Sequence, residues 1–546
     1  MKTNKLSIIA ASAMLALMVS CAGEDNTQSN NDKGSKEKED VGTTVFATNF
    51  MSDGIGTRTS MDYSSGNFFW EKSDRIYVKD DTETFKTSSN SVADSKQTAF
   101  KFMMPGTYEA SNKYMVYYPG ENGTNNNVTI KDNQQQDIPN DNTHFGTSGD
   151  CGMGYGEKSN GQFNFKLDHK AAYLCFLPST SHDLVSTYIT KIEVTSDNEI
   201  AGSYTLDLNS ETLVGTGSYK TITLNLGNSD SYKDGFPLNN NDPSLTTNGA
   251  FMVIYPGTHK LTVKYHVKDI QTEVEGVITK KLKSFDYKMG EYYDIKSKLD
   301  VQSYDSYVYM WDAKYHAWYE YESSQPALRD DPGTNYPKSN TDKRWYNDQI
   351  ITTGTGGAQA VNLPTKDCPN VNEMLWYCLK GDPHWDSDKM WTTLKHLYKG
   401  GMWFLKKQHI EGFKSESFTW KKYSQETEQE TYDYRNPDGP HQVQFQSPWS
   451  KNNSVYQGTP SSHGKDASMY FYLPAFENCT KDGTIRDENH KYGMGLEGQY
   501  WSSTGYSLQD TPPNKNYGAF NFSFIQTRVG IYRSDRAGGM RCVKFE

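Results

Sequence analysis

The sequence TITLNL, residues 221–226, alternates polar and apolar side chains with a period of two. Residues 261–267 (LTVKYHV) and 163–167 (FNFKL) alternate in the same way. This period puts the apolar side chains on one face of a β-strand and leaves the other face to solvent. Asn-rich runs at 121–127 and 238–248 are typical of the loops between such strands. The pattern predicts half-buried antiparallel sheets between residues 43 and 300.

The composition of the 546-residue chain fits a β protein of three or four domains. Only 35% of it is hydrophobic and the mean hydropathy is −0.81, which excludes a protein with many membrane-spanning helices. Aromatic residues make up 13% of the chain, so enough large side chains are present to build buried cores. The net charge is −11 and no Lys/Arg stripe is present, so we expect no nucleic-acid partner.

The N-terminus predicts export. Lys2 and Lys5 precede an apolar stretch at residues 6–19, whose length suits a signal peptide rather than a spanning helix. Residues 17–21 (LMVSC) resemble a bacterial lipobox, which implies that Cys21 is lipidated and holds the precursor at the outer membrane. An ordinary secretory signal with an incidental cysteine is the alternative.

The leading segment divides into two parts on this interpretation. Residues 1–20 form the lipoprotein signal peptide, and residues 21–42 contain no aromatic residue and many polar ones. A segment of that composition cannot bury enough apolar surface to fold, so we expect a tether.

A short motif recurs further along the chain. YMVYYPG at residues 114–120 returns as FMVIYPG at residues 251–257, an apolar strand followed by a Pro-Gly stop. Repetition at such a distance indicates two related domains, although convergence on so simple a pattern is the alternative. We expect them to occupy residues 43–180 and 181–300.

The order and spacing of motifs in these two domains resemble those of fimbrillins, which are lipoprotein pilins. The resemblance implies two transthyretin-like β-sandwich domains. The motifs are Trp70 followed by DRIYV at 74–78, YMVYYP at 114–119, QQDIP at 135–139, FKLDHKAA at 165–172 and MGEYYDI at 289–295.

The composition changes after residue 300, where ten of the eleven tryptophans lie. Asn370 with Glu373 three residues later resembles a capping box and predicts a helix that ends at Gly381. We expect a second helix from Asp386 to about Lys399, and strands further on. Residues 301–546 are therefore expected to form a separate α+β domain.

This C-terminal region resembles the FISUMP domains, which have a C-type-lectin-like fold. The similar motifs are GQYWSST at 498–504, AFNF at 519–522 and RAGGMRCV at 536–543. Residues 368–374 and 398–401 resemble the modules that follow fimbrillin domains. The fold class expected for the whole chain is thus mostly β: two transthyretin-like sandwiches followed by an α+β lectin-like domain.

The sequence contains no recognisable pattern for catalysis, a cofactor or a metal. The motifs HExxH, CxxC and GxSxG are absent, as are the calcium-ligating motifs of lectins. We therefore expect no catalytic residue, no cofactor and no metal. A surface enzyme that acts on glycans is the rival interpretation, because carboxylate pairs leave no sequence motif.

Six cysteines remain after Cys21, an even number that permits disulfides in an exported chain. Their spacing does not assign pairs, and buried free thiols are the alternative. In the lectin-like domain, Cys479 and Cys542 are expected to form a structural disulfide, or none.

Three tryptophans lie in polar stretches, in contrast to those with core-like patterns. Trp385, Trp420 and Trp449 are therefore candidates for exposed contacts with a host glycan or a protein ligand, and packing in the core is the alternative.

The two resemblances together imply a subunit at the tip of a surface pilus. A fimbrillin matures when a protease cuts after an Arg in the loop that follows its first strand, and Arg58-Thr59 lies in such a loop after residues 43–50. The cut would release the lipidated strand, so that the subunit leaves the outer membrane for an extracellular fimbrium. Another fimbrial subunit would then donate a β-strand to the empty groove.

The C-terminal residues 541–546 (RCVKFE) are expected to be the last strand of their own domain, so that the subunit accepts a strand and donates none. An uncut lipoprotein that acts as a pilus anchor or as a free-standing lectin is the alternative.

Overall fold

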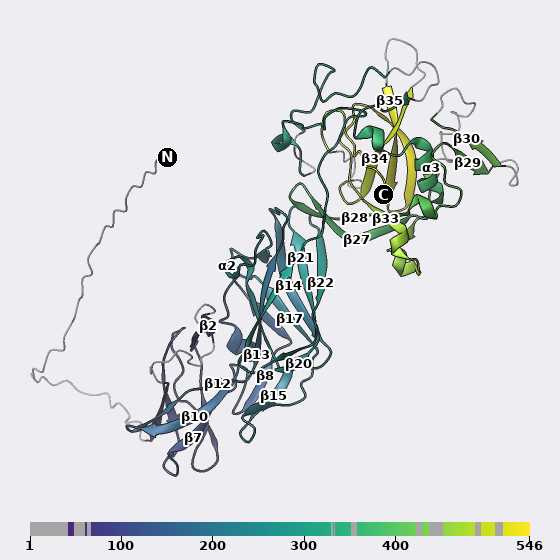
Figure 1. The fold of residues 1–546 in the computed structure, drawn as a ribbon. Helices are drawn as coiled ribbons and strands as arrows, with labels where there is room; N and C mark the ends of the chain where they lie inside the picture. The colour runs from purple at the N-terminus through teal and green to yellow at the C-terminus, as the bar shows by residue number, and fades with distance from the viewer. Residues whose placement is uncertain are drawn as a thin grey trace, which may run out of the picture. The chain divides into compact units, whose positions relative to one another are not determined.

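The computed structural model describes residues 42–48, 60–62, 67–94, 96–328, 331, 333–350, 358–421, 429–435, 451–485, 493–507 and 517–546. The prediction of a mostly β fold is confirmed, since strands greatly outnumber helices (Figure 1). Within these ranges, no helix is both long and apolar enough to cross a membrane.

The first domain is built on an eight-stranded sheet with the order β5-β4-β7-β10-β11-β1-β6, in which β12 also pairs with β10. Just beyond β5, Ser89 N–H donates to the carbonyl of Met103 in β6 (2.8 Å), which joins the two ends of the sheet. The strands are β1 (Thr43–Thr48), β4 (Tyr77–Lys79), β5 (Phe85–Thr87), β6 (Lys101–Pro105), β7 (Lys113–Tyr118), β10 (Gly152–Ser159), β11 (Gln162–Phe165) and β12 (Asp168–His169), and β2 (Ser60–Asp62) pairs separately with β3 (Asn67–Phe69).

An aromatic core fills this curved sheet. The Trp70 ring meets Phe102 and Tyr118 edge to face, at centroid distances of 5.0 and 5.7 Å. Phe46 of β1 stacks on Phe163 of β11 at 4.7 Å. Edge-to-face and stacked aromatic pairs add to the free energy gained from burial alone.

The second domain packs three smaller sheets around one core. The largest has the order β22-β21-β14-β17-β9 with β18 paired to β14, and the others are β19-β13-β24 and β16-β15-β8. The helical turns α1 (Phe145–Ser148) and α2 (Leu245–Asn248) and the hairpin of β20 (Gly257–His259) with β23 (Phe285–Tyr287) complete it. The strands are β8 (Asn127–Ile130), β9 (Asn133–Gln136), β13 (Ala172–Ser179), β14 (Thr187–Ser196), β15 (Gly202–Asp207), β16 (Thr212–Val214), β17 (Thr221–Leu226), β18 (Phe236–Pro237), β19 (Ala250–Ile254), β21 (Leu261–Asp269), β22 (Glu275–Lys281) and β24 (Tyr292–Lys298).

The strand pairing does not divide at residue 180, where we expected the boundary between the two sandwiches. β13 lies between β19 and β24, and β8 and β9 pair with β15 and β17. All eight residues of β13 are buried, as expected of a central strand covered on both faces. Residues before 180 therefore build the core of the second domain.

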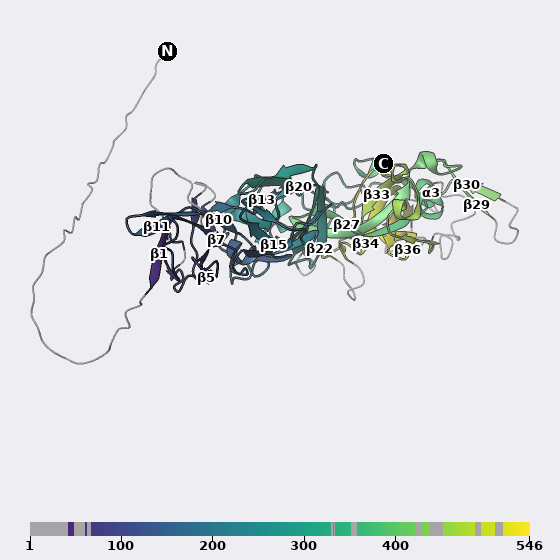
Figure 2. The ribbon, with the colours of Figure 1, turned by 90° about the horizontal axis from the view of Figure 1, so that it is seen from below.

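The C-terminal region contains two five-stranded sheets and the helix α3 (Val371–Lys380), which packs against β34 and β36 (Figures 1 and 2). The first sheet has the order β25-β27-β28-β33 with β32 beside β27, and the second has the order β26-β34-β35-β36-β31. The strands are β25 (Gln302–Ser303), β26 (Ala358–Gln359), β27 (His384–Thr393), β28 (His396–Leu405), β31 (Lys451–Asn452), β32 (Tyr456–Gln457), β33 (Tyr470–Pro474), β34 (Glu497–Ser507), β35 (Tyr517–Ile525) and β36 (Arg528–Asp535), with a separate hairpin of β29 (Phe418–Lys421) and β30 (Gln429–Tyr432).

Short 3-10 turns connect these strands. They are η1 (Glu322–Ser324), η2 (Thr365–Asp367), η3 (Lys407–His409), η5 (Pro460–His463) and η6 (Ala467–Met469).

The capping box that predicted α3 is confirmed. The Asn370 side chain accepts from the backbone N–H groups of Asn372 and Glu373, and Glu373 Oε2 accepts from Asn370 N–H at 2.8 Å. These bonds satisfy donors that the first helical turn leaves unpaired.

The second helix, expected from Asp386 to about Lys399, is wrong. This segment forms the antiparallel hairpin β27–β28, which turns at Leu394 and Lys395 with positive φ values of 50° and 68°. Trp391 pairs with Tyr398 across the hairpin, and its indole N–H donates to Gly400 O at 2.9 Å. Cross-strand aromatic pairing has prevailed over the helical spacing of the apolar residues.

The expectation of a last strand at residues 541–546 is also wrong, because β36 is the final strand and Arg541 makes only a single bridge to Tyr500. These residues are nevertheless part of the core. Phe545 is 3% exposed and packs against the rings of Tyr377 and Phe522 at 5.6 and 5.4 Å.

Replacing Phe46 tests the contribution of β1. Phe46→Ala removes a fully buried ring, so we expect the free energy of unfolding of the first domain to fall by about 3–5 kcal/mol. Native-state hydrogen exchange of the β11 amides measures this change. Thr44→Ala, at a half-buried position of the same strand, is the control and should cause a smaller loss. Equal losses would contradict the central role of the Phe46 ring.

Candidate functional site

Most of the residues that the sequence predicts for maturation and ligand binding lie outside the part of the chain that the structure describes. Cys21, Arg58, Thr59 and Trp449 lie outside the described residues, and for Trp420 the backbone belongs to β29 while the side chain is not described.

The expected exposure of Trp385 is wrong. Its side chain is 4% exposed and meets Phe524 edge to face at 6.5 Å. The neighbours that suggested a polar surface, His384 and Asp386, are buried too. Asp386 Oδ2 accepts from the indole N–H of Trp403 at 3.0 Å, so these polar groups serve the packing of the hairpin. Trp385 is therefore a core residue.

Cys479 and Cys542, for which we expected a disulfide or none, are not bonded to each other in the structure, where the six described cysteines are thiols. Cys479 exchanges backbone hydrogen bonds with Gly539, at 2.7 and 2.9 Å. Cys542 lies three residues further along, where its Sγ is 3.3 Å from Thr365 Oγ1.

The first candidate site is the place that β1 occupies in the first sheet. β1 lies beside β11 (Figure 2) and is paired with β6 on its other edge. It runs parallel to β11, with Phe46 opposite Phe163 and Thr48 opposite Phe165. On the β6 side, Thr48 N–H donates to Phe100 O at 3.1 Å. Removal of β1 would therefore leave two strand edges with unpaired backbone groups.

The same place is also an apolar socket. The Phe46 ring is enclosed by Phe163 and by Tyr108, whose ring centroid lies 5.2 Å away. Gly156 of β10 makes room for the ring, because a Cβ there would lie 3.1 Å from two of its atoms. The socket is thus shaped for a large apolar side chain carried on a strand.

The second candidate site lies where the β27–β28 hairpin meets the second domain. The buried Asp269 carboxylate is its centre. Its Oδ1 accepts from Ser186 Oγ at 2.7 Å, and its Oδ2 accepts from Leu397 N–H at 3.1 Å. His396 Nδ1 lies 3.0 Å from Ser186 Oγ and 3.4 Å from Asp269 Oδ2.

These groups resemble a catalytic triad only in composition. The same ring nitrogen of His396 faces both Ser186 and Asp269, whereas a catalytic histidine uses one nitrogen for each partner. All three side chains are also buried. The arrangement therefore serves to hold the hairpin.

Burial alone would raise the pKa of Asp269. The hydrogen bonds from His396, Ser186 and the N–H groups of Leu397 and Thr272 outweigh burial and hold the pKa well below its ordinary value. The carboxylate is therefore charged over the whole physiological pH range.

Sequence reasoning missed this cluster. Asp269 ends a strand and precedes a turn, where an aspartate is common. Nothing in the sequence connects Asp269 to His396, which lies in another domain. His396 also belongs to the segment that we predicted to be a helix. A correct prediction of the hairpin would have placed His396 directly after the turn, where its ring needs a hydrogen-bonding partner from outside the hairpin.

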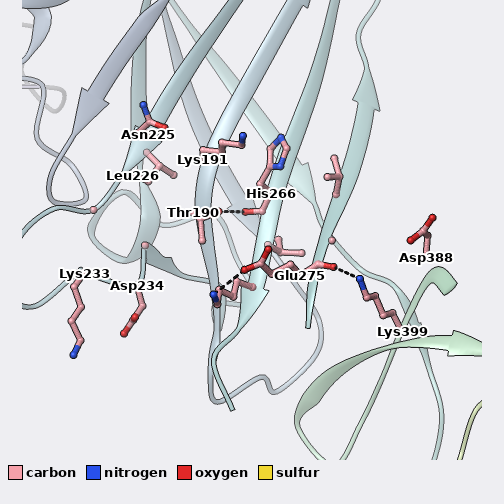
Figure 3. Close-up of a pocket in the computed structure, with 16 residues that line it drawn as sticks. Thr190, Lys191, Asn225, Leu226, Lys233, Asp234, His266, Glu275, Asp388 and Lys399 are labelled. Carbon is pink, nitrogen blue, oxygen red and sulfur yellow. Dashed lines mark hydrogen bonds and ion pairs between the residues drawn. The ribbon is translucent and has the colours of Figure 1, made fainter. Parts of the chain in front are cut away.

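A polar cleft of about 1010 Å³ opens beside this junction (Figure 3). Its wall is one face of the sheet β17–β14–β21–β22, and Asp388 and Lys399 reach it from the hairpin. Glu275 forms an ion pair with Lys268 at 2.8 Å, and its carbonyl accepts from Lys399 Nζ at 3.2 Å. The remaining charged lining residues are Lys191, Lys233 and Asp234.

The cleft suits a ligand rich in hydroxyl or amide groups. Charges of both signs lie beside the amide of Asn225 and the hydroxyl of Thr190, so donors and acceptors alternate. Burial and the positive charge of Lys191 lower the pKa of His266, so its ring is neutral at neutral pH. Among the described residues, no group of three or more His, Cys, Asp or Glu side chains could hold a metal ion.

The Asp269 cluster can be tested by substitution. In Asp269→Ala, several buried donors lose their acceptor, and we expect the junction to weaken by about 3 kcal/mol. Hydrogen exchange at the Leu397 amide should accelerate roughly 100-fold. Asp286→Ala, at an exposed site of the same domain, is the control.

The pH dependence of this effect follows from the lowered pKa. The contribution of Asp269 is complete above the unfolded pKa of about 3.9 and is lost as the pH falls through the lower folded value. The difference in melting temperature between the wild type and Asp269→Ala should stay constant from pH 7 to about 4 and shrink below that. A difference that disappears between pH 7 and pH 5 would contradict the assignment of this effect to Asp269.

Comparison with known proteins gives only slight similarities. No protein-family model and no curated protein matches the chain. A protein assigned to cell adhesion from Bacteroides ovatus is 11% identical with a TM-score of 0.29, over 47% of this chain and 92% of that one. The fimbrial anchor protein Mfa2 from Porphyromonas gingivalis is 14% identical with a TM-score of 0.22, over 46% and 90%. TM-scores this low assign neither a fold nor a function to the chain.

Proposed function

We propose that the protein is a structural and adhesive subunit of a bacterial surface pilus, assembled by strand exchange after its first strand is removed. The observation that carries the proposal is the position of β1. It lies between two other strands, and its buried Phe46 fills a socket formed by other parts of the chain. A strand with these properties can be replaced by an equivalent strand from another subunit.

The sequence supplies the elements needed to remove β1. The lipobox-like Cys21 would anchor the precursor in the outer membrane, and Arg58-Thr59 follows β1 closely enough for a cut between them to release it. The precursor is then an outer-membrane lipoprotein, and the mature subunit is extracellular. Its partners are the maturation protease and a neighbouring fimbrial subunit.

The C-terminal residues support a place at the pilus tip. Arg541 is 3% exposed and forms an ion pair with Asp305 at 2.6 Å, and Phe545 is buried in the core. Withdrawal of this segment to serve as a donor strand would expose that core. A subunit that accepts a strand and keeps its own C-terminal residues would cap the filament.

Two other functions remain as alternatives. An uncut lipoprotein would act as a pilus anchor or a free-standing lectin, and a surface enzyme would act on glycans. N-terminal sequencing of the surface protein separates them: a start at Thr59 indicates a polymerised subunit, and a lipidated Cys21 indicates an anchor.

Arg58→Ala tests maturation. A trypsin-like protease reads the charge of arginine, so the variant should keep its lipid and its first strand and stay monomeric at the membrane. Immunoblots of sheared pili and of membranes measure the distribution. Arg75→Lys, at the next arginine in the chain, is the control and should be cut normally. Normal incorporation of Arg58→Ala into pili would place the cut elsewhere.

The ligand is proposed to be a glycan or an exposed protein patch, bound by the C-terminal domain without calcium. Trp420→Ala and Trp449→Ala should keep the fold, and one of them should weaken binding by about 2 kcal/mol. Glycan arrays and host-cell adhesion of the full chain, with and without EDTA, measure this.

Trp385→Ala is the matched control for this experiment, because loss of a core ring should destabilise the domain itself. Loss of binding in EDTA, or unfolding of all three variants, would contradict the proposal.

A further inference from the structure

Cys368 and Cys542 lie side by side although most of the C-terminal domain separates them in sequence. Burial raises the pKa of the Cys368 thiol, and the neighbouring Cys542 thiol raises it further. Thr365 Oγ1 lies 3.3 Å from Cys542 Sγ, and Thr365 O accepts from Cys368 N–H at 3.1 Å. One turn thus holds both thiols.

Both cysteines are held in place by their neighbours in the chain. Pro369 O accepts from Ser503 N–H at 3.1 Å and from Ser502 Oγ at 3.0 Å. Arg541 O accepts from Trp501 N–H at 2.9 Å. Because three consecutive residues of β34 fix both segments, the sulfur atoms are brought together by the fold itself. A disulfide needs this proximity of the two backbones.

The other cysteines of this domain have different surroundings. Cys378 lies on α3, where its Sγ contacts Val529 O at 3.6 Å. Cys479 pairs through its backbone with Gly539, as described above. Cys378 is therefore a suitable control, because it is buried in the same domain but its sulfur contacts Val529 O rather than Cys368 or Cys542.

We propose that Cys368 and Cys542 form an intramolecular disulfide in the exported protein, which ties the C-terminal segment to the turn that precedes α3. The proposal rests on the export assumed in the proposed function and does not depend on polymerisation. Secreted and surface proteins meet an oxidising environment in which such bonds persist.

The oxidant would be the disulfide of a cell-envelope thiol oxidase. Cys542 is the more exposed thiol, so its thiolate attacks one oxidant sulfur, breaks the oxidant's S–S bond and forms a mixed disulfide. The Cys368 thiolate then attacks Cys542 Sγ and releases the oxidant as a dithiol. Together the two cysteines lose two protons and two electrons, and the oxidant gains these two protons and two electrons.

Burial raises the pKa of the Cys368 thiol well above its ordinary value. The second attack therefore belongs to a stage of folding at which the C-terminal segment has not yet packed.

Peptide mapping of the native protein tests the proposal. The protein is taken from the cell surface, free thiols are blocked with N-ethylmaleimide, and the chain is digested with trypsin without reductant. We expect residues 367–380 joined to residues 542–544, with fragment ions that assign the bond to Cys368 rather than Cys378. A blocked Cys542, or a bond from Cys542 to Cys479 or Cys378, would overturn the proposal.

Variants add a second measurement. A reductant should lower the melting temperature of the wild type and of Cys378→Ser, and should leave that of Cys368→Ser unchanged. An unchanged melting temperature of the wild type would contradict a bond that contributes to stability.

The Arg58→Ala protein separates this inference from the proposed function. The disulfide should form in it as in the wild type, whether or not the chain polymerises. A disulfide in both proteins without pili would refute only the pilus function. Pili without the disulfide would refute only this inference.

Discussion

A strand inside a sheet must satisfy its backbone groups on both edges, and β1 meets this requirement between β11 and β6. The rest of the first domain depends on it, because the sheet closes on itself only while that place is filled. Phe46 adds a large ring to the aromatic core at the same point. Loss of β1 would therefore expose hydrogen-bonding edges and an apolar socket together. The combination favours replacement by another strand over an empty site.

The junction at Asp269 is built on a different principle. A buried carboxylate is costly unless several donors surround it, and those donors come from two domains. Thr272 Oγ1 adds a bond to Leu397 O at 2.8 Å, and Leu397 itself belongs to the core of the second domain. The hairpin is thus held by polar and apolar contacts at once. Under the proposed function, this connection would carry force between the C-terminal domain and the rest of the subunit.

The sequence predicted local structure wherever one pattern dominated. The alternation in residues 221–226 and 261–267 corresponds to β17 and to most of β21, and the capping box at Asn370 begins α3. The predictions of secondary structure and exposure failed where contacts between distant residues determined the structure. Apolar spacing in β27–β28 suggested a helix, yet pairing of Trp391 with Tyr398 produced a hairpin. Trp385 has polar neighbours, but those neighbours are themselves buried. Distant partners such as Asp269 with His396 leave no trace in local sequence.

The two ends of the described chain differ in how easily they could leave the fold. β1 contributes one large ring and two rows of backbone bonds, all of which an incoming strand can reproduce. In residues 541–546, Arg541 forms an ion pair and Phe545 places a ring in the core. The Glu546 carboxylate accepts hydrogen bonds from the Tyr377 hydroxyl and from Lys407 N–H. These contacts depend on individual side chains rather than on a repeating backbone pattern, so a generic strand cannot replace them. Of these two segments, β1 is therefore the one whose contacts another strand could reproduce.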